Sequence, residues 1–177
     1  MAGKQIAIVS TLNRFKTIGA FLVFALLLGA CRPMYGETSM GSQTITELAS
    51  IEVNELPGRV GQKIRNELIF LFTGGNHSVQ PKYKLEIVYR ESVLGVLFKR
   101  TDDAAGKIYS LDVTYTLRDI TGKSELTKGR SHARAAFDKH KSTYSNIRAE
   151  RDAKNRAAKD IANDINTRLA AYISGNR

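Results

Sequence analysis

Two runs of alternating apolar and polar residues constrain this chain more than any other feature. Apolar side chains occupy every second position of residues 83–89, and the same pattern returns over residues 109–117. A period of two is typical of a β-strand with one buried and one solvated face. Residues 119–122 supply a turn after the second run. We therefore predict antiparallel hairpin strands, followed by a fourth strand over residues 123–138.

Helical periodicity flanks these strands. Apolar residues recur at steps of three and four over 59–72, and Gly74 and Gly75 then end the predicted helix. A longer amphipathic helix is predicted over 144–174, with the apolar residues from Ile147 to Ile173 mostly on one stripe. Residues 44–54 are rich in β-branched side chains and predict a first strand. The order β-α-β-β-β-α predicts an α+β two-layer sandwich, a four-stranded mixed sheet covered on one face by two helices.

The first thirty residues have the charge order of a secretory signal. Lys4, Arg14 and Lys16 are the only charged residues there, and an uncharged apolar run follows over 18–30. A transmembrane helix needs about 20 apolar residues, and this run is shorter. An ordinary signal peptide and a short uncleaved anchor both remain open as alternatives.

The end of this run indicates its type. Leu28-Gly29-Ala30-Cys31 resembles the bacterial lipobox, in which the cysteine is lipidated. Cys31 is the only cysteine, so it has no intramolecular disulfide partner. The resemblance implies cleavage before Cys31 and a covalent diacylglycerol and N-acyl chain on it, and several acyl chains anchor a protein stably. Arg32, where an Asp would favour the inner membrane, favours the periplasmic face of the outer membrane.

The predicted organisation is a signal peptide over 1–30, a lipidated tether over 31–43 and a single domain over 44–177. Loss of residues 1–30 removes three basic residues and no acid, so the net charge falls from +10 to about +7. A basic surface attracts polyanions. Because the export signal makes nucleic acid an improbable partner, phosphorylated glycolipid and acidic phospholipid are the expected ones.

Catalytic and metal-binding motifs are missing from the sequence. No Gly-x-Ser-x-Gly elbow occurs, and His77, His132 and His140 lack the spacing of metal ligands. We therefore predict no enzyme, no metal site and no cofactor beyond the acyl chains.

The predicted fourth strand carries the best candidate site. Lys128, Arg130, His132 and Arg134 project to one side at a period of two, and Arg suits phosphate through paired hydrogen bonds. This row could equally be the solvated outer face of a half-covered sheet. The apolar residues 93–98 form either a buried strand continuation or a surface for a partner or acyl chains.

Three segments together resemble one family. Cys31-Arg32-Pro33-Met34-Tyr35-Gly36 resembles the Cys-Gly-Phe-Arg-Pro-Leu-Tyr-Gly start of the LptE family of alphaproteobacterial type, with the Gly-Phe pair missing. The similarity continues through residues 61–68 on the first helix. It ends in the alanine-rich terminal helix around residues 151–161.

The resemblance implies a lipoprotein that sits as a plug within the outer-membrane β-barrel LptD and assists the assembly of lipopolysaccharide into the outer leaflet. It implies no catalysed reaction. It also implies direct binding of lipopolysaccharide by basic residues, for which the charge pattern nominates Lys128, Arg130, Arg134, Lys99 and Arg100. A generic envelope lipoprotein that binds anionic lipid or cell-wall polymer is the alternative, and a secreted enzyme is a further one.

Overall fold

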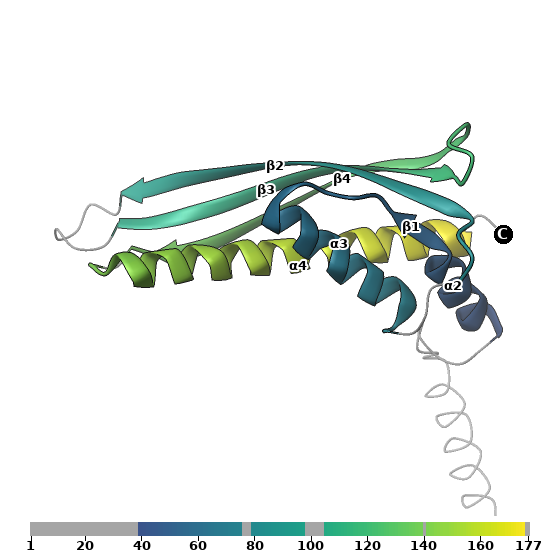
Figure 1. Ribbon diagram of the computed structural model, residues 1–177, viewed down its shortest axis with the longest axis horizontal. Coiled ribbons are helices and arrows are strands. Elements are labelled where there is room, and N and C mark those ends of the chain that lie inside the picture. Colours follow the sequence, from purple (N-terminus) through teal and green to yellow (C-terminus); the bar gives the residue numbers. More distant parts are fainter. Residues whose placement is uncertain (1–38, 76–78, 98–104, 140, 176–177) are drawn as a thin grey trace, which may run out of the picture. The chain divides into compact units, whose positions relative to one another are not determined.

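The computed structural model describes residues 39–75, 79–97, 105–139 and 141–175. Ser42–Arg177 forms one compact unit. Its elements follow the order shown in Figure 1: α2 (Ser39–Ala49), β1 (Ile51–Val53), α3 (Gly58–Thr73), β2 (Tyr83–Leu97), β3 (Ala105–Asp119), β4 (Glu125–Asp138) and α4 (Thr143–Gly175). Residues 1–38, which include the predicted signal peptide and Cys31, lie outside the described part of the chain.

The four strands form one mixed sheet in the order β1-β2-β3-β4. β1 pairs in parallel with the first three residues of β2, and the other two pairings are antiparallel. The β2–β3 register runs without interruption from Tyr83 opposite Asp119 to Leu97 opposite Ala105. Because the ladder is regular, odd-numbered side chains of β2 and β3 share one face and even-numbered ones share the other.

α3 and α4 lie on the same face of this sheet, and we call that face the inner face (Figure 1). The core between the layers consists of odd-numbered strand residues and the apolar stripes of both helices. Its fully buried side chains include Leu85, Tyr109, Leu111, Leu117, Ile64, Leu68, Phe72, Ile161, Ile165 and Leu169. Alanines of α4 at 153, 157, 158 and 162 are also buried, so the helix can approach the sheet closely. The predicted two-layer α+β architecture is confirmed.

α3 ends at Thr73, directly before Gly74 and Gly75, as the sequence predicts. Gly74 adopts the left-handed conformation, with φ of 62°, and its N–H donates to the carbonyl of Phe70 at 2.9 Å. A side chain with a Cβ atom is disfavoured in this conformation, and glycine is not.

A polar network lies under the half of the β2–β3 hairpin farther from β1. The buried Tyr109 hydroxyl donates to Glu91 Oε2 at 3.0 Å. Lys154 of α4 lies 3.7 Å from the same carboxylate oxygen and 2.9 Å from Glu150, and its ammonium group stands over the Tyr109 ring. Burial is the main reason that the pKa of Tyr109 is raised, and the hydrogen bond to Glu91 adds to it. The network attaches the hairpin to α4.

The prediction of a strand over 44–54 was wrong in its first part. Residues up to Ala49 belong to α2, which begins at Ser39 within the predicted tether, and only Ile51–Val53 is a strand. Leu48 is buried in the core while Ile45 stays exposed, so one helical face packs inward. Burial outweighed the β-propensity of the threonines, which is a weak preference.

For the apolar residues 93–98 the structure decides between the two alternatives where it describes them, and on α4 one burial prediction was wrong. β2 does continue through the apolar segment as a strand, yet Val93 and Leu94 are 42% and 62% exposed, so that part is not buried. Ile147, which the helical stripe placed with the core residues, is 47% exposed. Phe98 lies outside the described residues.

Candidate functional site

The basic side chains of β4 lie on the face of the sheet opposite the helices, which we call the outer face. Lys128, Arg130, His132 and Arg134 are all exposed, while the alternate residues from Ser131 to Phe137 are buried. The predicted alternation of β4 is therefore confirmed. The structure brings three of the five nominated lipopolysaccharide-binding residues, Lys128, Arg130 and Arg134, into one row.

The register places further polar groups beside this row. Arg130 faces Thr114 and His132 faces Asp112 on β3, and Asp112 in turn faces Arg90 on β2. His132 Nδ1 and Asp112 Oδ1 are 2.6 Å apart. Because β3 lies between β2 and β4, Arg90 of β2 and Arg130 of β4 lie on opposite sides of the Asp112 carboxylate.

A hollow of about 850 Å³ lies at this place. Its lining comes from β2, β3, β4 and α4: Val88, Tyr89, Arg90, Asp112, Val113, Thr114, Arg130, Ser131, His132, Asp164 and Arg168. On the outer face the lining includes the guanidinium groups of Arg90 and Arg130, which can bind a phosphate by charge-assisted hydrogen bonds, whereas Asp164 and Arg168 belong to α4 on the inner face. The hollow is therefore chemically suited to an anionic headgroup.

Contacts with α4 fix the position of β4. The Ser131 hydroxyl donates to Asp164 Oδ2 at 2.6 Å, and Arg168 Nε contacts both oxygens of the same carboxylate at 2.9 and 3.0 Å. The hydrogen bond with Asp164, followed by its charge, raises the pKa of Arg168. Since Ser131 lies between Arg130 and His132, these bonds hold the basic row in register above the helix.

Gly129 lies between Lys128 and Arg130 on β4, where there is no room for a side chain. A Cβ atom at this position would lie 2.4 Å from the ring and hydroxyl atoms of Tyr115, which crosses the inner face beneath β4. Burial raises the pKa of Tyr115, as expected for a phenol in the core. The Tyr115 ring fills the space that a side chain at position 129 would need, so only glycine fits there without a shift.

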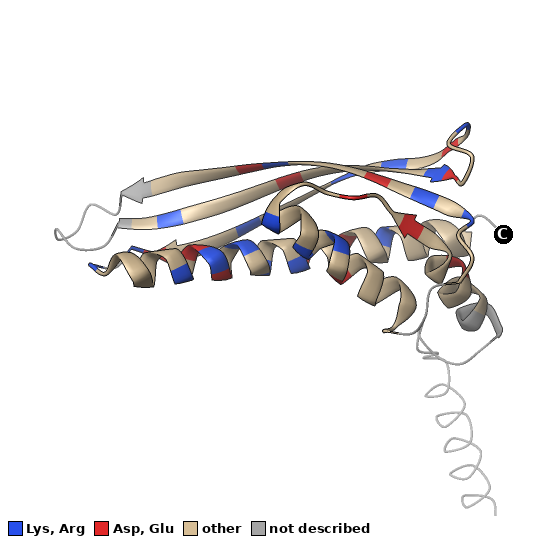
Figure 2. Ribbon diagram, in the orientation of Figure 1, with Lys and Arg blue, Asp and Glu red and all other residues tan. Residues whose placement is uncertain are grey.

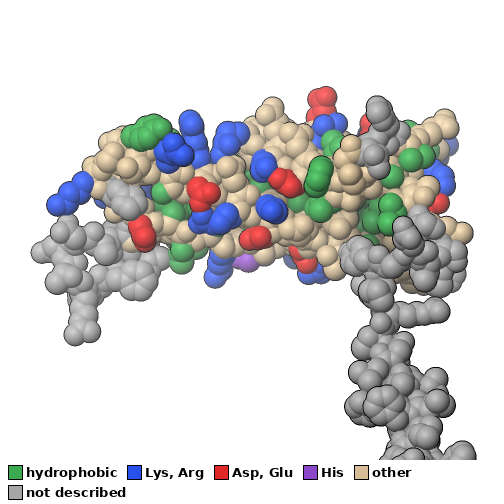
Figure 3. Space-filling model, turned by 90° about the horizontal axis from the view of Figure 1, so that it is seen from below, with side chains coloured by type: hydrophobic (Ala, Val, Ile, Leu, Met, Phe, Trp, Pro, Cys, Tyr) green, Lys and Arg blue, Asp and Glu red, His purple; other side chains and the backbone are tan. Residues whose placement is uncertain are grey.

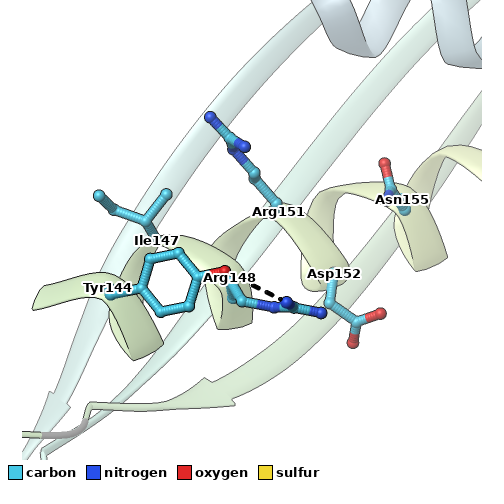
Figure 4. A pocket seen from close by; sticks show the side chains of 6 residues that line it. All are labelled: Tyr144, Ile147, Arg148, Arg151, Asp152 and Asn155. Atoms are coloured by element: carbon cyan, nitrogen blue, oxygen red, sulfur yellow. Dashed lines mark hydrogen bonds between the residues drawn. The ribbon is translucent and has the colours of Figure 1, made fainter. Parts of the chain in front are cut away.

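A second hollow, of about 340 Å³, lies at the start of α4 (Figure 4). Tyr144, Ile147, Arg148, Arg151, Asp152 and Asn155 line it. The Arg148 guanidinium donates to the Tyr144 hydroxyl at 3.3 Å and lies 5.9 Å from the centre of that ring. Asn155 also accepts a hydrogen bond on Oδ1 from Arg59 of α3 at 3.1 Å. Sequence reasoning missed this hollow, because Ile147 fits the apolar stripe of the helix.

The remaining nominated residues lie outside the described part of the chain. Lys99 and Arg100 fall within residues 98–104, and Cys31 falls within residues 1–38. Their predicted roles stay predictions.

The two faces of the unit differ in charge pattern. Lys and Arg alternate with Asp and Glu along α4 (Figure 2), and the view from below shows both signs interspersed over the helices (Figure 3). Many of these charges are paired at i,i+4 spacing, as in Arg156 with Asp152 and Lys63 with Glu67. On β4, by contrast, the basic residues Lys128, Arg130 and Arg134 share one exposed face.

Among the described residues, no helix is both long enough and apolar enough to cross a membrane.

Fold and charge define an α+β domain, one helix-covered sheet with basic residues on its open face. The family model described as LptE, lipopolysaccharide-assembly, matches residues 43–169, and the chain belongs to that family. The chain is thus a lipoprotein of lipopolysaccharide assembly, as the sequence resemblance predicted.

Two solved structures of lipoproteins have a similar fold. A Caulobacter crescentus protein assigned as a lipoprotein is 26% identical with a TM-score of 0.63, and the match covers 76% of this chain and 98% of that one. A minor lipoprotein from Acinetobacter baumannii is 14% identical with a TM-score of 0.51, covers 68% of this chain and 88% of its own, and shows the fold alone. No curated protein matches the sequence.

Proposed function

We propose that this protein is lipidated on Cys31, held at the periplasmic face of the outer membrane, and seated in an LptD-like β-barrel. There it assists the assembly of lipopolysaccharide into the outer leaflet and binds lipopolysaccharide through its basic outer face. Membership of the LptE family and the sequence Leu28-Gly29-Ala30-Cys31 support this proposal. No reaction is assigned to the protein.

The row of cations on β4 is the observation that carries the binding proposal. Its members are exposed on a face that the two sheet-packing helices leave open, and Arg90 of β2 reinforces them across the hollow. Each guanidinium can donate two parallel hydrogen bonds to a phosphate, which a lysine ammonium cannot do. The phosphates of lipid A have the matching charge and geometry.

Charge reversal tests this surface directly. Arg130→Glu combined with Arg134→Glu should weaken capture of purified lipopolysaccharide at least about tenfold, because charge-assisted hydrogen bonds contribute about 1.5–3 kcal/mol each. Lys123→Glu with Lys159→Glu changes the net charge equally, in the β3–β4 turn and on α4, and should capture lipopolysaccharide nearly as well as the parent. Unchanged capture by the β4 double variant, with its circular dichroism preserved, would remove this site.

The barrel partner calls for a separate experiment. The lipidated protein, affinity-purified from membranes, should bring down a large β-barrel at one-to-one stoichiometry, and depletion of the protein should lower the amount of that barrel. Mass spectrometry of the same sample should find acyl chains on an N-terminal Cys31. A protein that purifies alone but still captures lipopolysaccharide would instead be a generic envelope binder.

A further inference from the structure

The outer face of the sheet changes in character along its strands. The even-numbered residues of β2 and β3 share this face, and the register aligns each of them with a residue of the neighbouring strand. At the end that lies near the β3–β4 turn, the Arg118 guanidinium is 3.1 Å from Glu86 and 3.4 Å from Glu125. This cation is therefore already paired within the protein.

The arginines farther along the same face lack such partners. Among the described residues, no carboxylate oxygen lies within 4 Å of a side-chain nitrogen of Arg90, Arg130 or Arg134. Asp112, which lies between the first two, contacts His132 instead. The three guanidinium groups can therefore bind an anion that comes from outside the chain.

An apolar row follows directly beyond these cations. The register aligns Leu94, Ile108 and Ala136 across the three strands on the outer face. Leu94 is 62% exposed, Ala136 is exposed and Ile108 is half-buried. Arg134 lies two residues before Ala136, about 7 Å along the strand, and β2 carries no charged residue beyond Glu91 (Figure 2). A cationic region and an apolar region therefore adjoin each other on one face.

This order of charge along the face indicates which kind of ligand it fits. The apolar row alone would suit many partners, but its position next to unpaired guanidinium groups favours a molecule that carries both phosphate and hydrocarbon. The next row places the exposed Asp138 opposite Gly106. Its carboxylate disfavours a phosphate at that end of the face, so the headgroup belongs in the middle and the hydrocarbon beyond it.

We propose that the row of Leu94, Ile108 and Ala136 contacts the acyl chains of a phosphorylated glycolipid whose phosphates lie between Arg90 and Arg130. The lipid then lies along the strands, with its acyl chains directed toward the end of β2. Arg90 and Leu94 are four residues apart, about 13 Å of strand, which a long acyl chain can cover. This inference rests on the proposed binding of lipopolysaccharide through the basic outer face, and it adds an acyl-chain contact and an orientation.

Two forms of one ligand separate the acyl contact from the phosphate contacts. Purified lipopolysaccharide carries both groups, and its chemically deacylated form keeps the phosphates and sugars without the hydrocarbon. In the same detergent, full-length lipidated Leu94→Gln should bind the acylated form at least about fivefold more weakly than the parent, because the contact with hydrocarbon is lost. Binding of the deacylated form should be unchanged, which also shows that the variant is folded.

Two further variants complete the experiment. Ile120→Gln is the matched control, because Ile120 is 46% exposed in the β3–β4 turn, outside the apolar row. It should bind both forms as the parent does. The double variant Arg130→Glu with Arg134→Glu should bind both forms more weakly, since both carry phosphates.

The outcomes distinguish a failure of this inference from a failure of the proposed function. If the β4 double variant binds both forms as the parent does, the proposed binding surface is wrong, and the acyl contact is wrong with it. If that variant is impaired while Leu94→Gln binds the acylated form as tightly as Ile120→Gln, only the acyl contact is overturned. A Leu94→Gln protein that loses a co-purifying barrel but keeps its binding of acylated lipopolysaccharide would assign the row to a protein partner, which also overturns the inference.

Discussion

The two faces of the β2–β4 sheet are built from alternate residues of the same strands, yet they differ in almost every respect. On the inner face, Leu85, Leu111 and Leu117 are almost completely buried under the helices. On the outer face, Arg90 and Arg130 stand exposed over the hollow, and Val88 is 74% exposed. The comparison teaches that stability is concentrated on one face, which leaves the other free to carry charge for binding.

The largest expected difference between the faces comes from removing aliphatic side chains. Leu111→Ala should lower the free energy of unfolding by about 2–5 kcal/mol, because it leaves a cavity in a fully buried site. Val88→Ala on the outer face should change it by less than about 0.5 kcal/mol. Urea denaturation followed by circular dichroism measures both. Similar losses in the two variants would show that the outer face is covered by something that contributes to stability.

A smaller loss is expected where a side chain of the inner face crosses beneath the basic row. Gly129→Ala should cost about 1–3 kcal/mol, because the added methyl group overlaps the Tyr115 ring and the strand or the ring must shift. Gly95→Ala, in open space on β2, is the matched control and should cost nothing measurable. If Gly129→Ala were as stable as the parent, Tyr115 would have to occupy another position, and the fixed spacing of Lys128 and Arg130 would lose its explanation.

Much of this arrangement could be predicted from the sequence, because each main element has a strong period. Each of these elements buries one face, and burial of apolar side chains is its largest energetic requirement. This produces the steps of three and four along α3 and the alternation in β2, β3 and β4. The alternation along β4 is also sufficient by itself to predict that Lys128, Arg130 and Arg134 share the exposed face. The helix α2 was missed because its few turns hold one buried leucine and several β-branched residues.

The rest of the candidate site depends on contacts between distant segments. Arg90 reaches the neighbourhood of Arg130 only because the β2–β3 and β3–β4 registers align Arg90, Asp112 and His132 in one row. The pattern of residues within one strand does not say which residue of the neighbouring strand lies opposite. The hollow at the start of α4 was missed for a related reason: the helical stripe that buries Ile161 continues through Ile147, which the sheet does not cover.

The network of Tyr109, Glu91 and Lys154 is an exception to the contrast between the two faces, because it is polar but lies on the inner face. Tyr109→Phe should lower the free energy of unfolding by about 1 kcal/mol through the lost hydrogen bond to Glu91. The pKa of Tyr109 is raised in the folded protein above its ordinary value of 10.0, chiefly by burial. Its contribution to stability is therefore complete below pH 10 and declines as the pH rises further, when the unfolded chain ionises first. Unfolding curves at increasing alkaline pH should show a steeper loss for the parent than for Tyr109→Phe, and parallel curves would contradict this account.

The smallest effect is expected at the turn that joins β3 to β4 and thereby sets which residues of β4 face outward. Asp119 accepts hydrogen bonds from the Thr121 hydroxyl at 2.5 Å and from the Ser124 N–H at 3.0 Å, and the Thr121 bond is the main reason that its pKa is lowered. A carboxylate whose pKa is lower in the folded state stabilises the fold above its ordinary pKa of 3.8, and this contribution disappears as the pH falls through the lowered value. Asp119→Asn should therefore shift the urea midpoint slightly at neutral pH and not at all in strong acid, where both side chains are uncharged. An equal shift at both pH values would mean that the turn depends on the shape of Asp119 rather than on its charge, and the orientation of the basic row would then be insensitive to acid.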